Sequence, residues 1–177
     1  MTKPSGVVFH FSEDPAIKEF TPHVARTAAD PRPLVWAVGQ DRVPDYWFPR
    51  QCPRAMAWVT PGTTEQDRRY LLGPGRHRRV HAVEYRWLER ITTCKLFCYS
   101  LPADSFELIK GEAPHAYISK MTVRPLGAPK ALPPLLELHE RARVQLRLLD
   151  NLWPWWDEVV GTSLGYSGIR LANAHPR

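Results

Sequence analysis

Short apolar runs separated by proline, glycine and charged residues dominate the first three quarters of the chain. In the first run, residues 7–12, alternation along a strand places Val8, His10 and Ser12 on one face. Short runs rich in valine and aromatic residues are typical of strands. The other predicted strands lie at 34–38, 55–59, 80–85, 95–100, 106–108, 117–119 and 121–126. Helical turns are predicted at 15–20, where Pro15 suits an early helical position, and around 65–72.

The pattern changes after Pro133. Leucines at helical spacing among charged residues predict a helix of roughly four turns within 133–149. A short helix at 157–164 and a last strand or extended tail at 167–174 are expected to follow. The three tryptophans within 153–156 are expected to cap a core, because each ring buries a large area. The predicted fold class is α+β, with a mostly antiparallel sheet of short strands and a C-terminal helical segment.

Length and composition favour one compact domain spanning residues 1–177, because 177 residues with 44% hydrophobic content suffice for a single core. No run approaches the roughly 18 apolar residues of a membrane helix, and the first residues do not resemble a secretory signal. Three cysteines give no disulfide framework. We therefore expect a cytoplasmic protein without a membrane partner, and the sequence leaves its oligomeric state open.

A net charge of +6 raises the question of a nucleic-acid partner. The densest basic run, residues 76–79, lies in a glycine- and proline-rich loop, which is more typical of a solvated face. The positive charge would suit a small anionic ligand or nucleotide equally well, and we favour such a partner over nucleic acid. No metal site is predicted, because Cys94 and Cys98 lack a following histidine pair at zinc-finger spacing.

Candidate chemistry first appears at the end of the opening strand. His10 is either a ligand-binding histidine or a half-buried structural one. Ser12 and Glu13 either contribute to a site with His10 or, together with Asp14, cap the next turn. The sequence alone leaves both interpretations open.

The loop 49–54 carries the second candidate group. Its two prolines restrict the backbone, so the loop is expected to be stiff and to present Cys52 between Arg50 and Arg54. The positive field of these arginines is expected to lower the pKa of Cys52 and make it a nucleophile. The alternative is a loop cysteine of no chemical consequence.

The sequence resembles a family of small, uncharacterised bacterial proteins, domain-of-unknown-function family 6886, over nearly the whole chain. The resemblance rests on five stretches, at residues 10–15, 34–37, 48–54, 117–119 and 167–174. Membership in this family implies no activity.

A weaker resemblance concerns architecture. The order of elements is similar to that of small ADP-ribosyltransferases of the rifampicin-modifying and DNA-modifying kinds, and this likeness implies NAD as the cofactor. On that likeness His10 would hold the nicotinamide ribose, Trp36 or Tyr46 would stack on the nicotinamide ring, and Arg50 or Arg54 would meet the pyrophosphate. Ser12, Tyr117 and Ser119 would lie in the same cofactor site. The stabilising acid would be Glu13, Glu84 or Glu107, none of which has a diagnostic spacing.

Three functions therefore remain in view. The first is a NAD-using transferase of the ADP-ribosyl type. The second is a non-catalytic module that binds an anionic nucleotide or metabolite through His10, Arg50 and Arg54. The third is a thiol enzyme that uses Cys52. A glutamate facing the His10 site would favour the first over the second.

Overall fold

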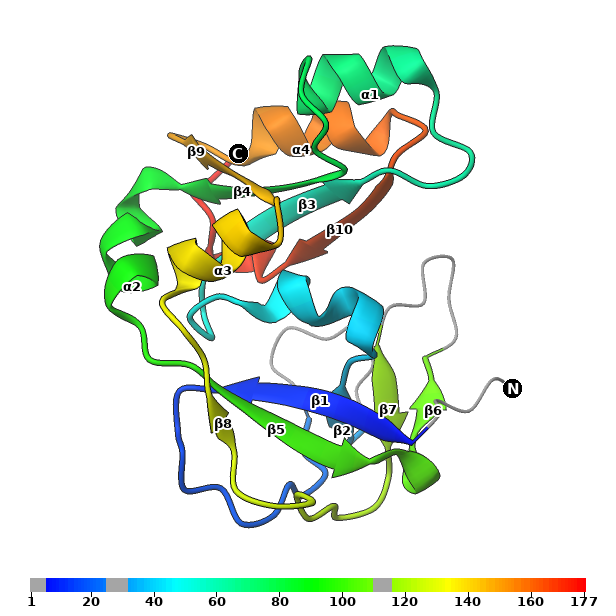
Figure 1. Ribbon diagram of the computed structural model, residues 1–177, viewed down its shortest axis with the longest axis vertical. Helices are drawn as coiled ribbons and strands as arrows, with labels where there is room; N and C mark the ends of the chain where they lie inside the picture. Colours follow the sequence, from blue (N-terminus) through cyan, green and yellow to red (C-terminus); the bar gives the residue numbers. More distant parts are fainter. Residues whose placement is uncertain (1–5, 25–31, 110–115) are drawn as a thin grey trace. The chain divides into compact units, whose positions relative to one another are not determined.

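The computed structural model describes residues 6–24, 32–109 and 116–177, and its fold is α+β (Figure 1). The chain forms two compact units, each built from two segments. Unit 1 comprises Met1–Trp47 and Lys95–Leu132, and unit 2 comprises Phe48–Cys94 and Pro133–Arg177. Each unit has its own buried core. The single domain expected from the length of the chain stays a prediction.

Unit 1 contains two antiparallel three-stranded sheets (Figure 1). One has the order β1-β5-β8, with β1 at Val7–Ser12, β5 at Phe97–Pro102 and β8 at Lys130–Ala131. The other has the order β2-β7-β6, with β2 at Val35–Ala37, β7 at Tyr117–Ser119 and β6 at Glu107–Leu108. The described part of unit 1 also contains the 3₁₀ helices η1, at Gln40–Tyr46, and η3, at Ala103–Ser105. Its core is formed by Val8, Phe20, Val35, Ala37, Tyr99, Leu101, Ala103, Phe106 and Val123.

The predicted first strand is confirmed, with Val8 and Ser12 buried on one face and His10 half buried between them. The helical turn predicted at 15–20 is wrong. The Ser12 Oγ accepts from the Asp14 backbone N–H at 3.1 Å, and the Asp14 Oδ1 accepts from that of Ala16 at 2.8 Å. Such side-chain bonds form local turns in place of helical bonds.

The strand predicted at 121–126 is also wrong. Within it Val123 forms an isolated bridge to Phe20, and Leu126 donates a single backbone hydrogen bond to the carbonyl of Ser100 at 2.9 Å. This bridge, with backbone hydrogen bonds of 2.8 and 3.0 Å, fixes the end of the segment that follows β1.

Unit 2 contains a four-stranded sheet of order β10-β3-β4-β9. Its strands are β3 at Arg54–Trp58, β4 at Arg79–Glu84, β9 at Gln145–Leu149 and β10 at Gly165–Ile169. The β4–β9 pair is parallel, whereas the other pairs are antiparallel. Two short helices, α2 at Leu88–Thr93 and α3 at Leu135–Arg141, pack together, and the 3₁₀ helices η2 and η4 span Tyr85–Trp87 and Leu171–Asn173.

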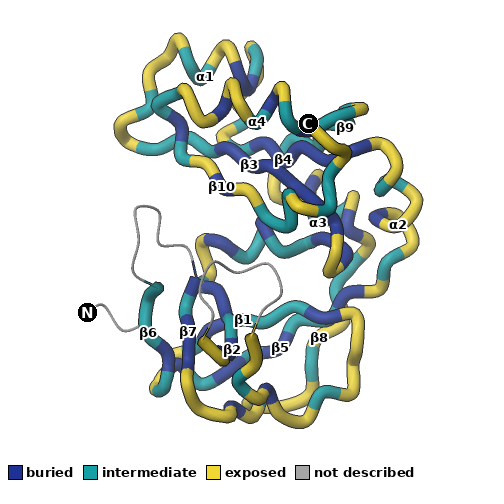
Figure 2. Tube along the Cα trace, turned by 180° about the vertical axis from the view of Figure 1, so that it is seen from behind, coloured by how far each residue is buried: buried dark blue, intermediate teal, exposed yellow. Residues whose placement is uncertain are grey.

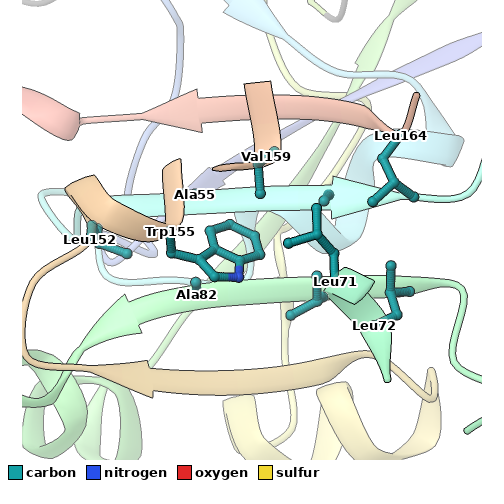
Figure 3. Close-up of a cluster of buried hydrophobic side chains, with 10 residues drawn as sticks. Ala55, Leu71, Leu72, Ala82, Leu152, Trp155, Val159 and Leu164 are labelled. Carbon is teal, nitrogen blue, oxygen red and sulfur yellow. The ribbon is translucent and has the colours of Figure 1, made fainter. Parts of the chain in front are cut away.

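Helices α1, at Glu65–Leu72, and α4, at Trp153–Val160, cover one face of this sheet (Figure 1). In Figure 3 Trp155 and Val159 of α4 reach toward the strands beside Leu71 and Leu72 of α1. The central strands β3 and β4 are mostly buried, whereas the outer sides of both helices are exposed (Figure 2). Trp155, only 8% exposed, and Trp156 therefore pack on a core, as predicted, whereas Trp153 is not part of it and donates to the carbonyl of His175.

The four-turn helix predicted within 133–149 is wrong. Helix α3 has seven residues and ends at Arg141, and Arg143 then adopts the left-handed region at φ 54°. A non-glycine residue in this region interrupts a helix. The following strand β9 carries side chains that reach α1: Gln145 Nε2 and Arg147 Nη2 donate to the carbonyls of residues 72 and 71 at 2.8 and 2.7 Å. They satisfy carbonyls that a helix end leaves without partners.

Candidate functional site

His10 lies near the end of β1 with its imidazole half buried. Its Nδ1 is 2.8 Å from the carbonyl oxygen of Trp36, and its ring centroid is 4.5 Å from that of Phe20. A carbonyl oxygen only accepts hydrogen bonds, so Nδ1 carries a proton and donates it to Trp36; in the neutral form of the ring Nε2 is then an acceptor. The histidine is therefore held in one tautomer and one orientation.

Strands β1 and β2 separate at this histidine. Phe9 and Val38 form an isolated bridge, with both backbone hydrogen bonds at 2.9 Å. In a continued antiparallel ladder the carbonyl of Trp36 would accept from the N–H of Phe11. It accepts from the His10 side chain instead. The imidazole of His10 thus takes the place of a backbone N–H as the donor to Trp36.

Four half-buried aromatic residues share one face of unit 1. Bridge partners point to the same side of a sheet, so Trp36, two residues before Val38, shares the side of Phe9 and Phe11. Tyr46, at the end of η1, stacks on Phe11 with ring centroids 6.3 Å apart and an interplanar angle of 18°. We call Phe9, Phe11, Trp36 and Tyr46 the aromatic face. It unites the two residues predicted to stack on a nicotinamide.

The indole N–H of Trp36 is buried and has no hydrogen-bond partner among the residues that the structure describes. The indole N–H groups of Trp87 and Trp155 in unit 2 share this property. An unsatisfied buried donor costs about 1–3 kcal/mol.

Three further predicted cofactor-binding residues, Ser12, Tyr117 and Ser119, lie on the core side of unit 1. Tyr117 and Ser119 are opposite Ala37 and Val35 of the core. The Ser119 hydroxyl, 2% exposed as a residue, donates to the hydroxyl of Ser105 at 3.0 Å. These contacts give the three residues structural roles, and their contact with a cofactor stays a prediction.

Cys52 is fully buried, with its Sγ 3.5 Å from the carbonyl oxygen of Pro53. Burial raises the pKa of this thiol to about 12, and the positive charge of Arg54 offsets only part of the effect. The predicted lowering of the Cys52 pKa is therefore wrong, because desolvation of the thiolate outweighs the arginine field. A thiol that stays protonated at neutral pH is a poor nucleophile.

The two loop arginines differ in their surroundings. Arg50 is exposed. Arg54 is 3% exposed: its Nη1 donates to the carbonyl of Cys52 at 3.0 Å, and its guanidinium lies 5.1 Å from the ring centroid of Phe48. Both belong to unit 2, whereas His10, Trp36 and Tyr46 belong to unit 1. The predicted set is thus divided between the units, and a pyrophosphate role for either arginine stays a prediction.

Comparison with known proteins places the chain in a family. The model of DUF6886, a family of unknown function, matches residues 9–174. The chain belongs to the DUF6886 family. No curated protein and no solved structure matches it. The family resemblance in the sequence is confirmed, and because the function of the family is unknown, the function of this DUF6886 member must be argued from its geometry.

A buried histidine pair in unit 2 of this DUF6886 member was not among the residues singled out from the sequence. His81 on β4 and His139 on α3 are 0% and 2% exposed, and the Nδ1 of His81 is 3.0 Å from the Nε2 of His139. The Nδ1 of His139 is 2.7 Å from the carbonyl of Leu135, so it donates there and Nε2 accepts from His81. Phe48 packs against both rings at 5.1 and 5.4 Å. The sequence feature that could have revealed this pair is His81, a histidine inside an otherwise apolar strand.

The three candidate acids of the DUF6886 chain lie in different surroundings. Glu13 is exposed in the turn after β1, and Glu107 is half buried on β6 of unit 1. Glu84, on β4 of unit 2, is fully buried, and both of its carboxylate oxygens have partners. Its Oε1 accepts from the backbone N–H of His175 at 2.8 Å, and its Oε2 from Nε of Arg86 at 2.9 Å. Glu84 therefore anchors the C-terminal segment.

An open hollow of about 500 Å³ lies between α1 and α4 in unit 2. Its acidic lining residues are Asp67, Asp157 and Glu158. Hydrogen bonds from Ser163 hold the pKa of Asp67 below its ordinary value. Carboxylates repel the anionic ligand predicted for this DUF6886 member, so the hollow does not match that ligand.

Within residues 6–24, 32–109 and 116–177, no three histidine, cysteine, aspartate or glutamate side chains are grouped so that they could hold a metal ion. The described helices include none long and apolar enough to cross a membrane. The three cysteines of the chain, Cys52, Cys94 and Cys98, are free thiols.

Proposed function

We propose that this DUF6886 protein uses NAD as an ADP-ribosyl donor and that unit 1 holds the nicotinamide riboside end. The observation that carries the proposal is the hydrogen bond between His10 Nδ1 and the carbonyl of Trp36. In the neutral ring this bond makes Nε2 the acceptor, and a ribose hydroxyl is a donor of the matching kind. The tautomer is set before any ligand arrives, so binding needs no rearrangement of the ring.

The aromatic face lies on the other side of β1 from the side chains of Val8 and Ser12, and it supports the nicotinamide part of the proposal. The nicotinamide of NAD⁺ is a planar cation, which an indole or phenol ring attracts through its electron-rich face. Trp36 and Tyr46 supply such rings, and Tyr46 is already oriented by its stacking on Phe11.

The reaction is substitution at the ribose. The bond between C1′ and the nicotinamide nitrogen breaks, and neutral nicotinamide leaves with the electron pair. An acceptor hydroxyl or water attacks C1′ and releases its proton, so hydrolysis yields ADP-ribose, nicotinamide and one proton. Positive charge develops on the ribose in the transition state, as in glycoside hydrolysis.

The test combines binding and product release. Wild-type protein is titrated with NAD, ADP-ribose and nicotinamide in a thermal-shift assay, and free nicotinamide is measured by chromatography. A ligand at a hundredfold excess over its Kd stabilises the folded state by about 2.7 kcal/mol. We expect a shift with NAD and release of nicotinamide.

Two variants of His10 test the role of its Nε2 atom. In His10→Asn, the amide nitrogen can still donate to the carbonyl of Trp36, but the Nε2 acceptor is gone; His10→Ala removes both. His23→Asn is the matched control, because His23 is an exposed histidine of unit 1. We expect both His10 variants to lose the NAD shift and His23→Asn to keep it. Wild-type protein that shifts with none of the three ligands would overturn the proposal. A shift without release would indicate the non-catalytic binding module instead.

A further inference from the structure

The positive charge of the chain is concentrated in unit 2. This unit has 14 basic and 9 acidic residues, a net charge of +5, against +6 for the whole chain. All 14 of its basic residues are arginines, whereas the six lysines of the chain belong to unit 1. Arginine presents a planar fork of donors that can bind a phosphate through two hydrogen bonds at once, which lysine does not. The composition therefore favours unit 2 as the part that binds phosphates.

Two arginine-rich segments of unit 2 meet at one end of its sheet. Residues 76–78 lead into β4, and residues 141–143 precede β9. Strands β4 and β9 pair in parallel, so the segments before them lie at the same end of the sheet. The Nδ1 of His77 is 3.1 Å from the carbonyl oxygen of Arg143, and it donates there because a carbonyl only accepts. The sequence shows the first segment as a basic loop, but it does not show that Arg143 joins this loop.

Further contacts hold the loop that carries Arg76. The Nη1 of Arg68 donates to the carbonyl of Gly75 at 3.0 Å, and Arg68 is itself paired with Glu65. Gly75 leaves room for the ring of His77, since a Cβ there would lie 2.9 Å from its Cδ2. The backbone of this loop is thus held in place without a ligand, so binding costs less conformational entropy.

Three arginines of the two segments have no acidic partner. Arg76, Arg78 and Arg143 are exposed, and no ion pair or side-chain hydrogen bond joins them to any residue that the structure describes. The neighbouring Arg141 differs, because it is paired with Glu137. Like charges repel one another, and an anion that lies across the three arginines would relieve this repulsion. We call Arg76, Arg78 and Arg143 the arginine patch.

We infer that the arginine patch binds the phosphate backbone of a nucleic acid. The patch is independent of the proposed function, because it belongs to unit 2 and His10 belongs to unit 1. Exposed arginines suit an extended polyanion, whereas a small ligand usually occupies a concave site. Guanidinium groups that contact phosphates release the counterions condensed on the nucleic acid, so the affinity falls as the salt concentration rises. Contacts to the backbone carry no sequence information, so the patch binds different sequences alike.

The experiment measures the affinity for a fluorescent DNA duplex of about 20 base pairs by anisotropy, at salt concentrations from about 20 to 150 mM. The test variants are Arg76→Gln, Arg78→Gln and Arg143→Gln, each of which keeps a long polar side chain and removes one charge. Arg124→Gln is the matched control, because Arg124 is an exposed arginine of unit 1 that is paired with Glu19. The melting temperature of each protein shows whether it is folded.

For wild-type protein we expect the logarithm of the affinity to fall against the logarithm of the salt concentration with a slope of about −3 or steeper, because each phosphate contact contributes about −0.9. Each substitution in the arginine patch should make this slope shallower by about 1 and weaken binding roughly tenfold at the lowest salt concentration. Arg124→Gln should equal wild type. Glu140→Gln removes an exposed acid three residues before Arg143 and should tighten binding, a change that a folding defect does not produce.

Wild-type protein that does not bind the duplex at the lowest salt concentration would overturn the inference. Arginine variants that melt as wild type does and keep both its affinity and its salt slope would also overturn it, because the phosphate contacts would then lie elsewhere. Polyglutamate is the competing polyanion. If it displaces the duplex at an equal concentration of negative charges, the arginine patch fits an acidic protein surface rather than a nucleic acid. None of these outcomes depends on NAD binding by unit 1, so the patch and the proposed function are tested separately.

Discussion

At the scale of single residues, the buried His139 makes stability depend on pH. Burial lowers the pKa of His139 below its ordinary value of 6.5. As the pH falls below 6.5, the unfolded chain binds a proton that the folded chain does not, so the free energy of unfolding decreases. The limit is about 1.4 kcal/mol per pH unit for one group, and the decrease ends when the pH reaches the folded-state pKa. Above pH 6.5 this contribution is constant.

We therefore predict that His139→Gln destabilises the protein at pH 7 but weakens the loss of stability between pH 7 and 5. The loss at pH 7 should be about 1–3 kcal/mol, because the hydrogen bonds to Leu135 and His81 are buried. The measurement is the urea midpoint, followed by circular dichroism across this pH range. His23→Gln, at an exposed histidine, should behave as wild type. An unchanged pH dependence in His139→Gln would contradict the assignment.

Some residue-level features could be predicted from sequence and others could not. Alternation alone places His10 with Val8 and Ser12 on one face of β1, as the structure shows. Its tautomer could not be predicted, because it depends on a carbonyl 26 residues away. The prediction of a lowered Cys52 pKa was wrong for a related reason. The sequence shows the charged residues next to the thiol but not the burial of the thiol.

At the scale of elements, side-chain hydrogen bonds hold the C-terminal segment 171–177 to unit 2. Glu84 accepts from the backbone of His175, and Arg86, which pairs with Glu84, donates to the carbonyl of Asn173 at 2.6 Å. The amide of Asn173 donates in turn to the carbonyl of Gln51 at 2.8 Å. A single buried carboxylate thus connects β4, the C-terminal segment and the loop that carries Cys52.

We predict that Glu84→Gln loosens this segment. The carboxylate of Glu84 accepts from the His175 backbone and from Arg86 with one oxygen each. The amide of glutamine has a single oxygen and no negative charge, so one of these two donors would face the amide nitrogen instead. The expected loss is about 1–3 kcal/mol in the free energy of unfolding, with faster hydrogen–deuterium exchange across residues 171–177. Glu89→Gln, at an exposed glutamate of α2, is the matched control. Unchanged exchange in Glu84→Gln would show that Glu84 does not hold the segment.

Elements with local signals were predictable. Helix α1 begins at the cap Thr64, whose Oγ1 accepts from the N–H of Asp67, and ends at Gly73 with φ 77°; these residue types mark helix ends in sequence. Strand β9 was predicted as helix because the spacing of its leucines fits both the helical period and the alternation of a strand. The left-handed conformation of Arg143, which ends the helix, has no signature in the residue type.

At the scale of the whole molecule, the chain passes three times between the units. Residues 1–47 and 95–132 form unit 1, and residues 48–94 and 133–177 form unit 2. Composition and length indicate how much core a chain can build, but not which distant segments share it. All six residues of β1 pair with β5, and β3 and β4 pair with β10 and β9 from the C-terminal part. These pairings could not be predicted, because packing decides them.

This interleaving predicts how the chain behaves when it is cut between residues 94 and 95. The fragment 1–94 keeps β1 without its partner β5, and β3 and β4 without β10 and β9. An isolated pair of strands is marginally stable at best, so neither fragment 1–94 nor 95–177 should melt cooperatively by far-ultraviolet circular dichroism. Mixing the two should restore a cooperative transition, because each unit then regains both of its segments. A fragment 1–94 that melts cooperatively alone would contradict the interleaved architecture, whereas a mixture of 1–47 with 48–94 lacks the partner strands and serves as the negative control.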